Sequence, residues 1–381
     1  MATRSERTGL AILILRLSLR GILYRAYKFA GLPRLPEALS IEVTTRCVAR
    51  CIMCNIWKKR WDDLSLDIWL GLLRSSVFRN LRELDVTGGE PFLRDDLVRM
   101  VEGLLEEKRG NLRRLRSIAI TTNGFLPERI LSFTRGVIGR MEEAGLELVL
   151  AFSLDGVGEL HGRIRRFPNA WERLMESIEG AKHIRERHRN LILGVKTTIL
   201  PLNVRHLDAI LDFTRQHGLF MILSPFIRTE NRYENTDLML GFSEEELGLM
   251  RQFLEQREIK WDFHRTMLIS FLKTGRVKKP CSAGFNYFFI RANGDVYPCP
   301  LVKRSIGNFL LTPFGAILRS KALRTFRLDV GRLAECRTCT EPGLERYALP
   351  FEGFHCLRYL VGQGRRSFVE LFNHMGLNKY L

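Results

Sequence analysis

The stretch 47-CVARCIMC-54 places three cysteines at spacings of four and three residues, and no other thiol occurs before Cys281. It follows 38-ALSIEVTT-45, a run of apolar and β-branched residues that predicts a buried strand. A structural zinc ion and a cubane iron–sulfur cluster both take four protein ligands when they are fully ligated. Three thiols in a loop after a strand therefore predict a metal or cluster site with one open position.

Strand-like and helix-like segments alternate on both sides of this loop. The pattern predicts strands at 38–45, 82–90, 117–124, 146–156, 190–200 and 219–227, and helices at 65–78, 94–109, 126–144, 169–188 and 203–217. The strands are almost continuously apolar, as parallel strands with both faces covered should be. Such units predict an α/β fold with a parallel sheet, open or curled into a partial barrel, and functional groups at the carboxyl ends of the strands.

The character of the chain changes after Lys279-Pro280. The stretch 285-FNYFFIRANGDVYPC-299 predicts a β-hairpin that turns at Asn293-Gly294. Five cysteines lie in this part of the chain: Cys281, Cys299, Cys336, Cys339 and Cys356. We expect four parts, namely an N-terminal amphipathic extension (1–36), the strand–helix domain (37–275), a small α+β domain (278–345) and a C-terminal tail (346–381) with an amphipathic stretch at 367–375.

The composition describes a folded, strongly basic protein. The chain has 381 residues, is 45% hydrophobic and carries a net charge of +18. Such a charge favours anionic partners, although a solvated basic surface explains it equally well. We find no secretory signal, so we expect a reducing cytosol, where clustered cysteines are more often metal ligands than disulfides.

Residues 10–29 show a helical pattern with two different faces. Arg16, Arg20, Tyr24 and Lys28 recur every four residues, and most of the apolar side chains lie opposite them. The segment predicts a helix that either lies on an anionic membrane or packs against the body of the protein. No apolar run approaches the roughly 20 residues that a membrane-spanning helix needs.

The loop CVARCIMC resembles the C-x3-C-x2-C signature of radical S-adenosylmethionine (radical SAM) enzymes. Further resemblances to that family follow in order over residues 40–227: 86-VTGGEP-91, 121-TTNG-124, 153-SLDG-156 and 161-HGRIRR-166. Met53 departs from the family pattern, which places an aromatic residue before the third cysteine. A methionine can fill the same apolar space, so the departure carries little weight.

The resemblance implies a partial (βα)6 TIM-type barrel and a [4Fe–4S] cluster held by Cys47, Cys51 and Cys54. In this family the fourth iron binds S-adenosyl-L-methionine, whose reductive cleavage yields a 5′-deoxyadenosyl radical that abstracts hydrogen from the substrate. The implied cofactor-binding residues are Gly88, Gly89, Glu90, Asn123, Ser153, Asp155, Arg165 and Thr198. Their chemistry agrees, because glycines allow close backbone approach and a glutamate can pair with the ammonium group of methionine.

The second set of cysteines resembles the auxiliary-cluster domain of SPASM and twitch radical enzymes. The full SPASM pattern has seven cysteines, so the shorter twitch form fits better. It implies an auxiliary [4Fe–4S] cluster on Cys281, Cys299, Cys336 and Cys339, with Cys356 left as a core thiol, an alternative ligand or a catalytic thiol. Spacing alone also allows a zinc site. A fully ligated cluster would relay electrons, which suits oxidation or crosslinking of a substrate radical.

We therefore expect an enzyme, a radical SAM oxidoreductase or transferase, that acts on a small molecule or a lipid. The alternatives are a peptide or protein maturase of the SPASM type, an RNA-modifying enzyme and a non-enzymatic zinc protein. No nucleic-acid partner is expected, because no basic motif interleaved with aromatic residues is present. We expect a reducing partner of the flavodoxin or ferredoxin type, and a cytoplasmic protein with a peripheral contact at the inner face of the membrane through residues 10–29. The catalytic acid or base is not evident; the candidates are Arg228, Asn231, Tyr233 and His264.

Overall fold

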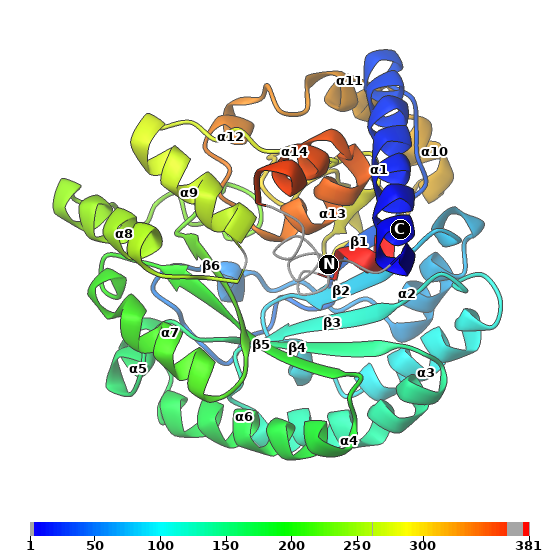
Figure 1. Cartoon of the computed structure of the whole chain (residues 1–381). Helices are drawn as coiled ribbons and strands as arrows, with labels where there is room; N and C mark the ends of the chain where they lie inside the picture. Colours follow the sequence, from blue (N-terminus) through cyan, green and yellow to red (C-terminus); the bar gives the residue numbers. More distant parts are fainter. Residues whose placement is uncertain (1–3, 261, 364–375, 381) are drawn as a thin grey trace.

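The computed structural model describes residues 4–260, 262–363 and 376–380, and its centre is a curved sheet of six parallel strands (Figure 1). The strands are β1 (Ala38–Glu42), β2 (Glu83–Thr87), β3 (Ser117–Thr122), β4 (Glu147–Ser153), β5 (Leu191–Ile199) and β6 (Phe220–Pro225). Each pairs in parallel with the next along the chain. The predicted partial TIM-type barrel is confirmed, and every predicted strand contains an observed one.

Helices cover the outer face of this sheet, as Figure 1 shows. They are α2 (Leu66–Leu73), α3 (Leu97–Lys108), α4 (Pro127–Glu143), α5 (Glu159–Arg165), α6 (Ala170–Arg187) and α7 (Leu207–Gln216), with α8 (Glu244–Gln256) and α9 (Asp262–Thr274) after β6. Short 3-10 turns also occur along the chain: η1 (Ile56–Lys58), η2 (Ser76–Phe78), η3 (Pro91–Leu93), η4 (Val204–His206) and η5 (Leu377–Tyr380). This arrangement leaves the inner face of the sheet available for a site.

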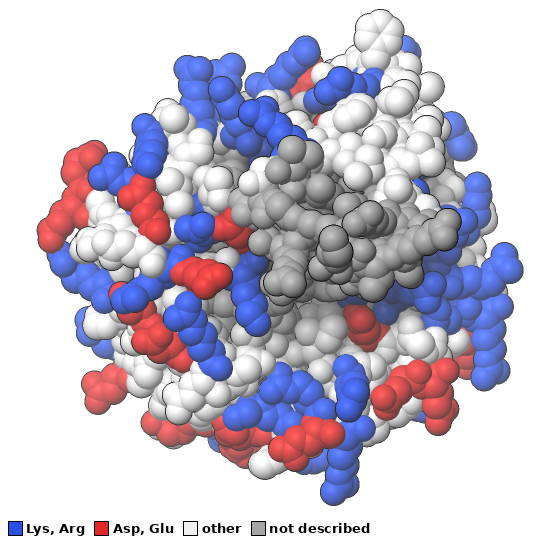
Figure 2. Space-filling view, in the orientation of Figure 1, with Lys and Arg blue, Asp and Glu red and all other residues white. Residues whose placement is uncertain are grey.

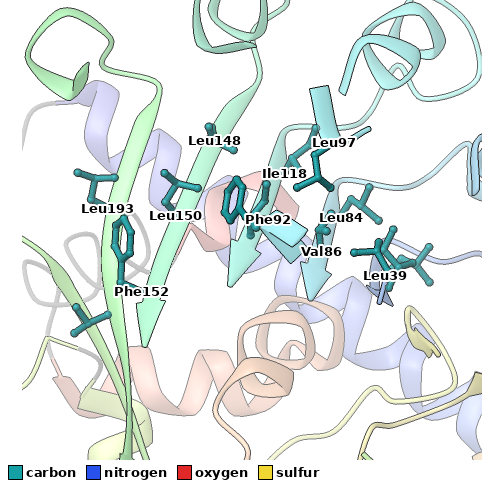
Figure 3. Packing of buried hydrophobic residues seen from close by; sticks show 14 of the residues in the cluster. Leu39, Leu84, Val86, Phe92, Leu97, Ile118, Leu148, Leu150, Phe152 and Leu193 are labelled. Atoms are coloured by element: carbon teal, nitrogen blue, oxygen red, sulfur yellow. The ribbon is translucent and has the colours of Figure 1, made fainter. Parts of the chain in front are cut away.

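The two faces of each strand carry different side chains. In β4, Leu148, Leu150 and Phe152 are fully buried in the core beneath the helices (Figure 3). The alternate residues Val149 and Ala151 are smaller and line a cavity on the inner face. This is the two-residue period of a strand, which sends successive side chains to opposite faces. The large residues therefore stabilise the barrel, while the small and polar ones leave room inside it.

The predicted hairpin of the second domain extends the same sheet. β7 (Tyr287–Ile290) pairs in parallel with β1, β8 (Asp295–Tyr297) pairs antiparallel with β7, and β9 (Gly307–Asn308) pairs antiparallel with β8. The turn lies where the sequence predicts it, and Gly294 adopts a φ of +87°, which favours glycine. The predicted second domain is thus joined to the barrel by backbone hydrogen bonds of a single nine-stranded sheet.

The first helix packs against the C-terminal part of the chain. α1 (Arg4–Ala30) contacts α11 (Lys321–Asp329), α13 (Gly343–Glu352) and α14 (Phe354–Gln363); α10 (Phe314–Arg319) and α12 (Ala334–Arg337) lie in the same region. No helix within the described ranges is long and apolar enough to cross a membrane. The predicted amphipathic stretch 367–375 lies outside the described residues.

The polar face of α1 is the face that packs inward. The Tyr24 hydroxyl donates a hydrogen bond of 2.7 Å to the carbonyl oxygen of Cys281, and Lys28 Nζ donates one of 2.9 Å to that of Val330. The opposite, apolar face is directed outward: Leu15 and Ile22 each keep 59% of their surface exposed. Of the two predicted roles for the helix, packing against the body of the protein is therefore confirmed for its polar face. On its apolar face, side chains such as Leu15 and Ile22 stay exposed.

A buried ion pair connects the end of β1 to the residue after β7. Arg291 Nε lies 3.2 Å from Oε1 of Glu42, and both side chains are almost completely buried. Burial raises the pKa of Glu42, while the Arg291 guanidinium opposes that shift. The guanidinium also lies 4.5 Å from the centre of the Trp61 ring. Because an isolated buried charge is costly, each member of the pair depends on the other.

We predict that Arg291→Met alone destabilises the fold by about 3–5 kcal/mol, since it leaves the buried Glu42 carboxylate with the Ala292 N–H but without its paired guanidinium. The double variant E42M/R291M should recover most of that loss, because both charges are then absent and apolar side chains fill the volume. The measurement is the midpoint of thermal unfolding for the two single variants and the double variant.

The matched control is the exposed pair of Arg205 and Glu245, whose atoms lie 2.5 Å apart in solvent. Arg205→Met should leave the thermal midpoint unchanged, because solvent screens an exposed pair. A double variant no more stable than Arg291→Met alone would contradict the assignment of a mutually dependent pair.

Candidate active site

A cavity of about 250 Å³ lies on the inner face of the barrel. Inward residues of the barrel strands form its wall, including Ser40 of β1, Asp85 of β2 and Lys196 of β5. Tyr287 of β7 and residues 341–344 and 346–347 close it from the side of the second domain. The cavity is therefore bounded jointly by the barrel and by the region that carries the second cysteine set.

The three cysteines of the first loop line this cavity together with Gly88 and Gly89. The glycine pair supports the loop directly: Gly89 N donates a hydrogen bond of 2.9 Å to Thr44 O. A Cβ atom on Gly88 would lie 2.3 Å from Thr44 O, and one on Gly89 would lie 2.2 Å from Arg46 O. Only glycine fits at either position without moving the loop, so the two motifs predicted separately form one structural unit.

The cysteines of this loop are partly buried, and hydrogen-bond donors lie near the sulfurs of two of them. Burial raises the pKa of Cys47 to about 12, so a free thiolate would be costly there. Asn123 Nδ2 lies 3.9 Å from Sγ of Cys47, and Arg165 Nη1 lies 3.6 Å from Sγ of Cys51. Donors directed at sulfur stabilise the electron-rich thiolates of an iron–sulfur cluster. The residues present thus fit a cluster that binds through three cysteines.

Six of the eight predicted cofactor-binding residues line the cavity: Gly88, Gly89, Asn123, Ser153, Arg165 and Thr198. The other two, Glu90 and Asp155, are fully buried and lie behind its wall. Asp155 accepts a hydrogen bond from Thr198 N and lies 2.5 Å from Arg165 Nη2, so it holds two lining residues in place.

Glu90 is fixed by three donors. Its carboxylate accepts hydrogen bonds from the backbone N–H groups of Phe92 and Asn123 and from Oγ1 of Thr122. Burial raises the pKa of Glu90 to about 7, although these hydrogen bonds oppose the shift. An ammonium group beside it would favour the ionised form. Direct contact of Glu90 with a ligand stays a prediction.

Four cysteines of the second set lie near one another. Burial raises the pKa of Cys299 well above its usual range, and charges on Cys339, Cys281 and Cys336 raise it further. Cys281, Cys299 and Cys339 share an apolar cluster with Tyr287, which also lines the cavity. Tyr287 therefore lies next to both the cavity and the second cysteine set.

Cys356 lies apart from this set. It is buried in another cluster with Leu17, Ile222, Leu349 and Leu377. Its environment is that of a core thiol, the first of the three roles considered for it. Within the described ranges, no three His, Cys, Asp or Glu side chains lie close enough to hold a single metal ion.

Of the four candidates for an acid or base, one lines the cavity, namely Tyr233. Arg228 is exposed and donates to Leu240 O, and Asn231 is buried and donates to Val302 O. His264 is buried against Glu345, at 3.0 Å, outside the cavity wall. The exposed or structural surroundings of these three argue against roles in chemistry.

Sequence reasoning missed several polar residues of the cavity: Ser40, Asp85, Lys196, Arg232, Glu341 and Arg346. Asp85 and Lys196 gave a usable signal, because each is a charged residue at an inward position of an otherwise apolar strand. Arg232, Glu341 and Arg346 come from loops and a helix of the C-terminal half, and nothing in their local sequence indicates that they reach the barrel.

Comparison with known proteins identifies two regions of the chain that match family models. Residues 41–213 match the model of the radical SAM superfamily, and residues 281–340 match SPASM, an iron–sulfur cluster-binding domain. A probable GTP 3′,8-cyclase of Methanocaldococcus jannaschii is 26% identical over 198 residues, which cover 50% of this chain and 59% of that protein. A probable GTP 3′,8-cyclase of Methanococcus maripaludis (strain C7) is 25% identical over 234 residues, covering 58% and 72%.

Solved structures share the fold at low identity. SuiB of Streptococcus suis bound to S-adenosylmethionine superposes with a TM-score of 0.58 at 14% identity, covering 82% of this chain and 72% of that one. The protein anSMEcpe with bound AdoMet and the Cp18Cys peptide gives 0.57 at 15%, covering 90% and 98%. The two domains indicate [4Fe–4S] clusters and S-adenosylmethionine as cofactors. With its cysteine loop, barrel and second cysteine set in the matching places, the chain is an enzyme of the radical SAM superfamily with a C-terminal SPASM iron–sulfur domain.

Proposed function

We propose that the protein is a radical SAM oxidoreductase that uses two clusters around one substrate cavity. Cys47, Cys51 and Cys54 hold a [4Fe–4S] cluster with an open iron for S-adenosylmethionine, and the second cysteine set, Cys281, Cys299, Cys336 and Cys339, holds an auxiliary [4Fe–4S] cluster. The observation that carries this proposal is the position of the cavity, which touches the first thiol set directly and the second through Tyr287. When bound, these cofactors supply a 5′-deoxyadenosyl radical that abstracts hydrogen from the substrate and an acceptor for the electron released afterwards.

The residues of the chain orient these groups. Arg165 and Asn123 donate toward the sulfurs of Cys51 and Cys47, and Asp155 fixes the guanidinium of Arg165. Glu90 offers a buried carboxylate for the ammonium of S-adenosylmethionine, and Ser153 provides a hydroxyl at the cavity wall for the ribose. A reductant of the flavodoxin or ferredoxin type would deliver the first electron.

The enclosed position of the cavity favours a small molecule, or the polar end of a lipid, as substrate. The cavity of about 250 Å³ would have to hold S-adenosylmethionine as well as the substrate, which leaves little room for a large substrate. Peptide modification is the alternative: SuiB has been crystallised with the precursor peptide SuiA. At 14% identity that likeness concerns the fold, so the chemistry of the cavity decides between the substrate classes.

We predict that the two cysteine sets contribute separately to the iron content. Replacing Cys336 and Cys339 with serine should remove the iron and sulfide of one [4Fe–4S] cluster, about half of the total, since each cubane holds four irons. Cleavage of S-adenosylmethionine to 5′-deoxyadenosine under reducing conditions should persist, because the first set is intact. Replacing Cys51 and Cys54 with serine should remove the other half and abolish cleavage. The measurements are iron, sulfide and zinc analysis of anaerobically purified protein and chromatography of the nucleoside product.

Cys356→Ser is the matched control, because this thiol is equally buried but lies in a separate apolar cluster. It should leave both the iron content and the cleavage unchanged. Zinc in place of iron at the second set, or loss of cleavage when only Cys336 and Cys339 are replaced, would refute the two-cluster assignment.

We also propose that α1 holds the enzyme on an anionic membrane surface. Its exposed apolar residues are Ile12, Ile14, Leu15, Leu19, Ile22, Leu23 and Phe29. Arg16 and Arg25 are exposed on the same helix, and Figure 2 shows uncharged side chains over the region of α1 with Lys and Arg at its margin. Apolar side chains bordered by cations suit the boundary between acyl chains and anionic headgroups.

The expected result is binding to vesicles of phosphatidylcholine with 30% phosphatidylglycerol that weakens at high salt. The variant L15E/L19E/I22E should lower the vesicle-bound fraction at least about tenfold, because three apolar anchors become charged. Sedimentation with vesicles measures the effect. Leu311→Glu is the control, since Leu311 is 85% exposed but lies outside α1. Equal binding of the triple variant and the wild type would rule out α1 as the contact.

A further inference from the structure

One part of the cavity wall consists of polar side chains and carries no cysteine. These side chains come from β1, β2 and the segment after β6. The relevant inward residues are Ser40, Asp85 and Thr87, and Arg232 follows from the loop after β6. The proposed function assigns none of these four residues to either cluster or to S-adenosylmethionine. They are therefore available to contact the substrate itself.

Arg232 is a cavity cation that forms no ion pair within 4 Å among the described residues, although Glu341 and Asp85 lie near enough for their charges to act on it. Its Nη2 donates a hydrogen bond of 2.9 Å to Oγ1 of Thr87, and its guanidinium lies 5.2 Å from the ring centre of Tyr233 and 5.3 Å from that of Phe289. Within the described part of the chain, no carboxylate oxygen lies within 4 Å of it. The aromatic rings and Thr87 hold the guanidinium in place while leaving its other donors without an anion.

The other arginines of the cavity are neutralised. Arg165 pairs with Asp155, and Arg346 pairs with Glu83. Lys196 lacks a carboxylate partner among the described residues, but it donates to Oγ1 of Thr121 and lies two residues before Thr198, on the cofactor side of the wall. Arg232 is partly buried, and its remaining N–H donors, which no carboxylate approaches to hydrogen-bonding distance among the described residues, can pair with an acidic ligand. Arg232 is thus the cation best placed to receive an acid from the substrate.

The carboxylate of Asp85, which also lines the cavity, lies near the Arg232 guanidinium and can accept hydrogen bonds from a ligand. Its Oδ2 accepts a hydrogen bond of 2.9 Å from Oγ of Ser40, which in turn accepts one of 3.0 Å from the Tyr287 hydroxyl. This chain orients the carboxylate, and no basic side chain of the described residues lies within 4 Å of it. Asp85 and Thr87 are two residues apart on the same face of β2, which separates their Cα atoms by roughly 6–7 Å. The wall therefore offers a fixed cation and a fixed acceptor a short distance apart.

We propose that Arg232 and Asp85 form the substrate-recognition site of the cavity and select a small molecule that carries an acidic group, a carboxylate or a phosphate, and a hydrogen-bond donor several ångströms from it. The guanidinium binds the acid through two parallel hydrogen bonds, and Asp85 accepts from the hydroxyl or ammonium of the substrate. The inference rests on the proposed function only in placing the substrate in this cavity. Ser40 and Tyr287 act as positioning residues for Asp85.

The test measures binding of acid probes to the reconstituted holoenzyme with S-adenosylmethionine bound, by isothermal titration calorimetry. The probes are inorganic phosphate, butyrate and 4-hydroxybutyrate, so that the arms separate a phosphate site from a carboxylate site. We expect the wild type to bind phosphate or the two carboxylates saturably. Arg232→Met should weaken that binding at least about tenfold, and Arg232→Lys should weaken it less, because lysine keeps the charge but not the paired donors.

Asp85→Ala should remove the preference for 4-hydroxybutyrate over butyrate, if the carboxylates bind, while leaving butyrate affinity within about twofold. If only phosphate binds, the affinities of the same variant for phosphoethanolamine and for inorganic phosphate are compared. Asp85 would accept a hydrogen bond from the ammonium group of phosphoethanolamine, so Asp85→Ala should remove the preference for that probe. Arg228→Met is the matched control, since Arg228 is exposed four residues earlier and does not line the cavity. It should bind every probe as the wild type does.

Cleavage of S-adenosylmethionine is measured in parallel for each variant. Arg228→Met is expected to retain it, and Arg232→Met is expected to keep the iron content and the thermal midpoint of the wild type, which shows that the variant is folded. Failure of the wild type to bind any of the probes, or equal affinities of Arg232→Met and Arg228→Met, would overturn the proposal. A protein without iron would instead contradict the proposed function, and the acid titration would still report on Arg232.

Discussion

The structure depends on β1 being hydrogen-bonded in parallel to strands on both sides. One neighbour is β2, the next strand of the barrel, and the other is β7, which comes more than two hundred residues later. The first cysteine loop follows β1, and Cys281 precedes β7. Because both strands belong to one sheet, the two cysteine sets are held on a single rigid frame. Tyr287, at the first residue of β7, then lies between the cavity and the second set.

The arginines around the cavity follow a rule, pairing with a carboxylate, with one exception. Glu42 pairs with Arg291, Asp155 with Arg165, and Glu83 with Arg346, so each of these buried charges has an opposite charge beside it. The pairs Glu42–Arg291 and Glu83–Arg346 also join segments that are far apart in the sequence, which makes them connections within the fold. Arg232 is the cavity arginine that departs from the rule, and a site that leaves a guanidinium without an anion is built to receive one.

The first helix also uses its two faces for different contacts. Tyr24 and Lys28 on its polar face bond to backbone carbonyls beside the second cysteine set, and its apolar residues face outward. A helix in this orientation links the surface of the enzyme to the region of the auxiliary cluster. The proposed membrane contact would therefore lie on the outer face of α1, and the region of the proposed electron acceptor would lie against its inner face.

Local pattern was a good guide to the strands, the helices and the hairpin turn at Gly294. It was a poorer guide to orientation. The period of residues 10–29 predicts two faces without saying which one packs, and the motif 86-VTGGEP-91 suggests a ligand contact without showing that Glu90 lies behind Asn123. Asp85 and Lys196 could have been noted as charged residues at inward strand positions, whereas Arg232 offered no such signal.

The sequence by itself determined the elements and the chemistry they carry, because strand period, turn glycines and cysteine spacing are properties of a few neighbouring residues. Only the tertiary structure decided that β7 joins β1, that α1 turns its apolar face outward, and that Arg232 lies in the cavity wall with a hydrogen bond to Thr87 and no ion pair within 4 Å among the described residues. Those outcomes depend on contacts between residues distant in the chain. Their energies are set by burial, and burial exists only once the whole chain has folded.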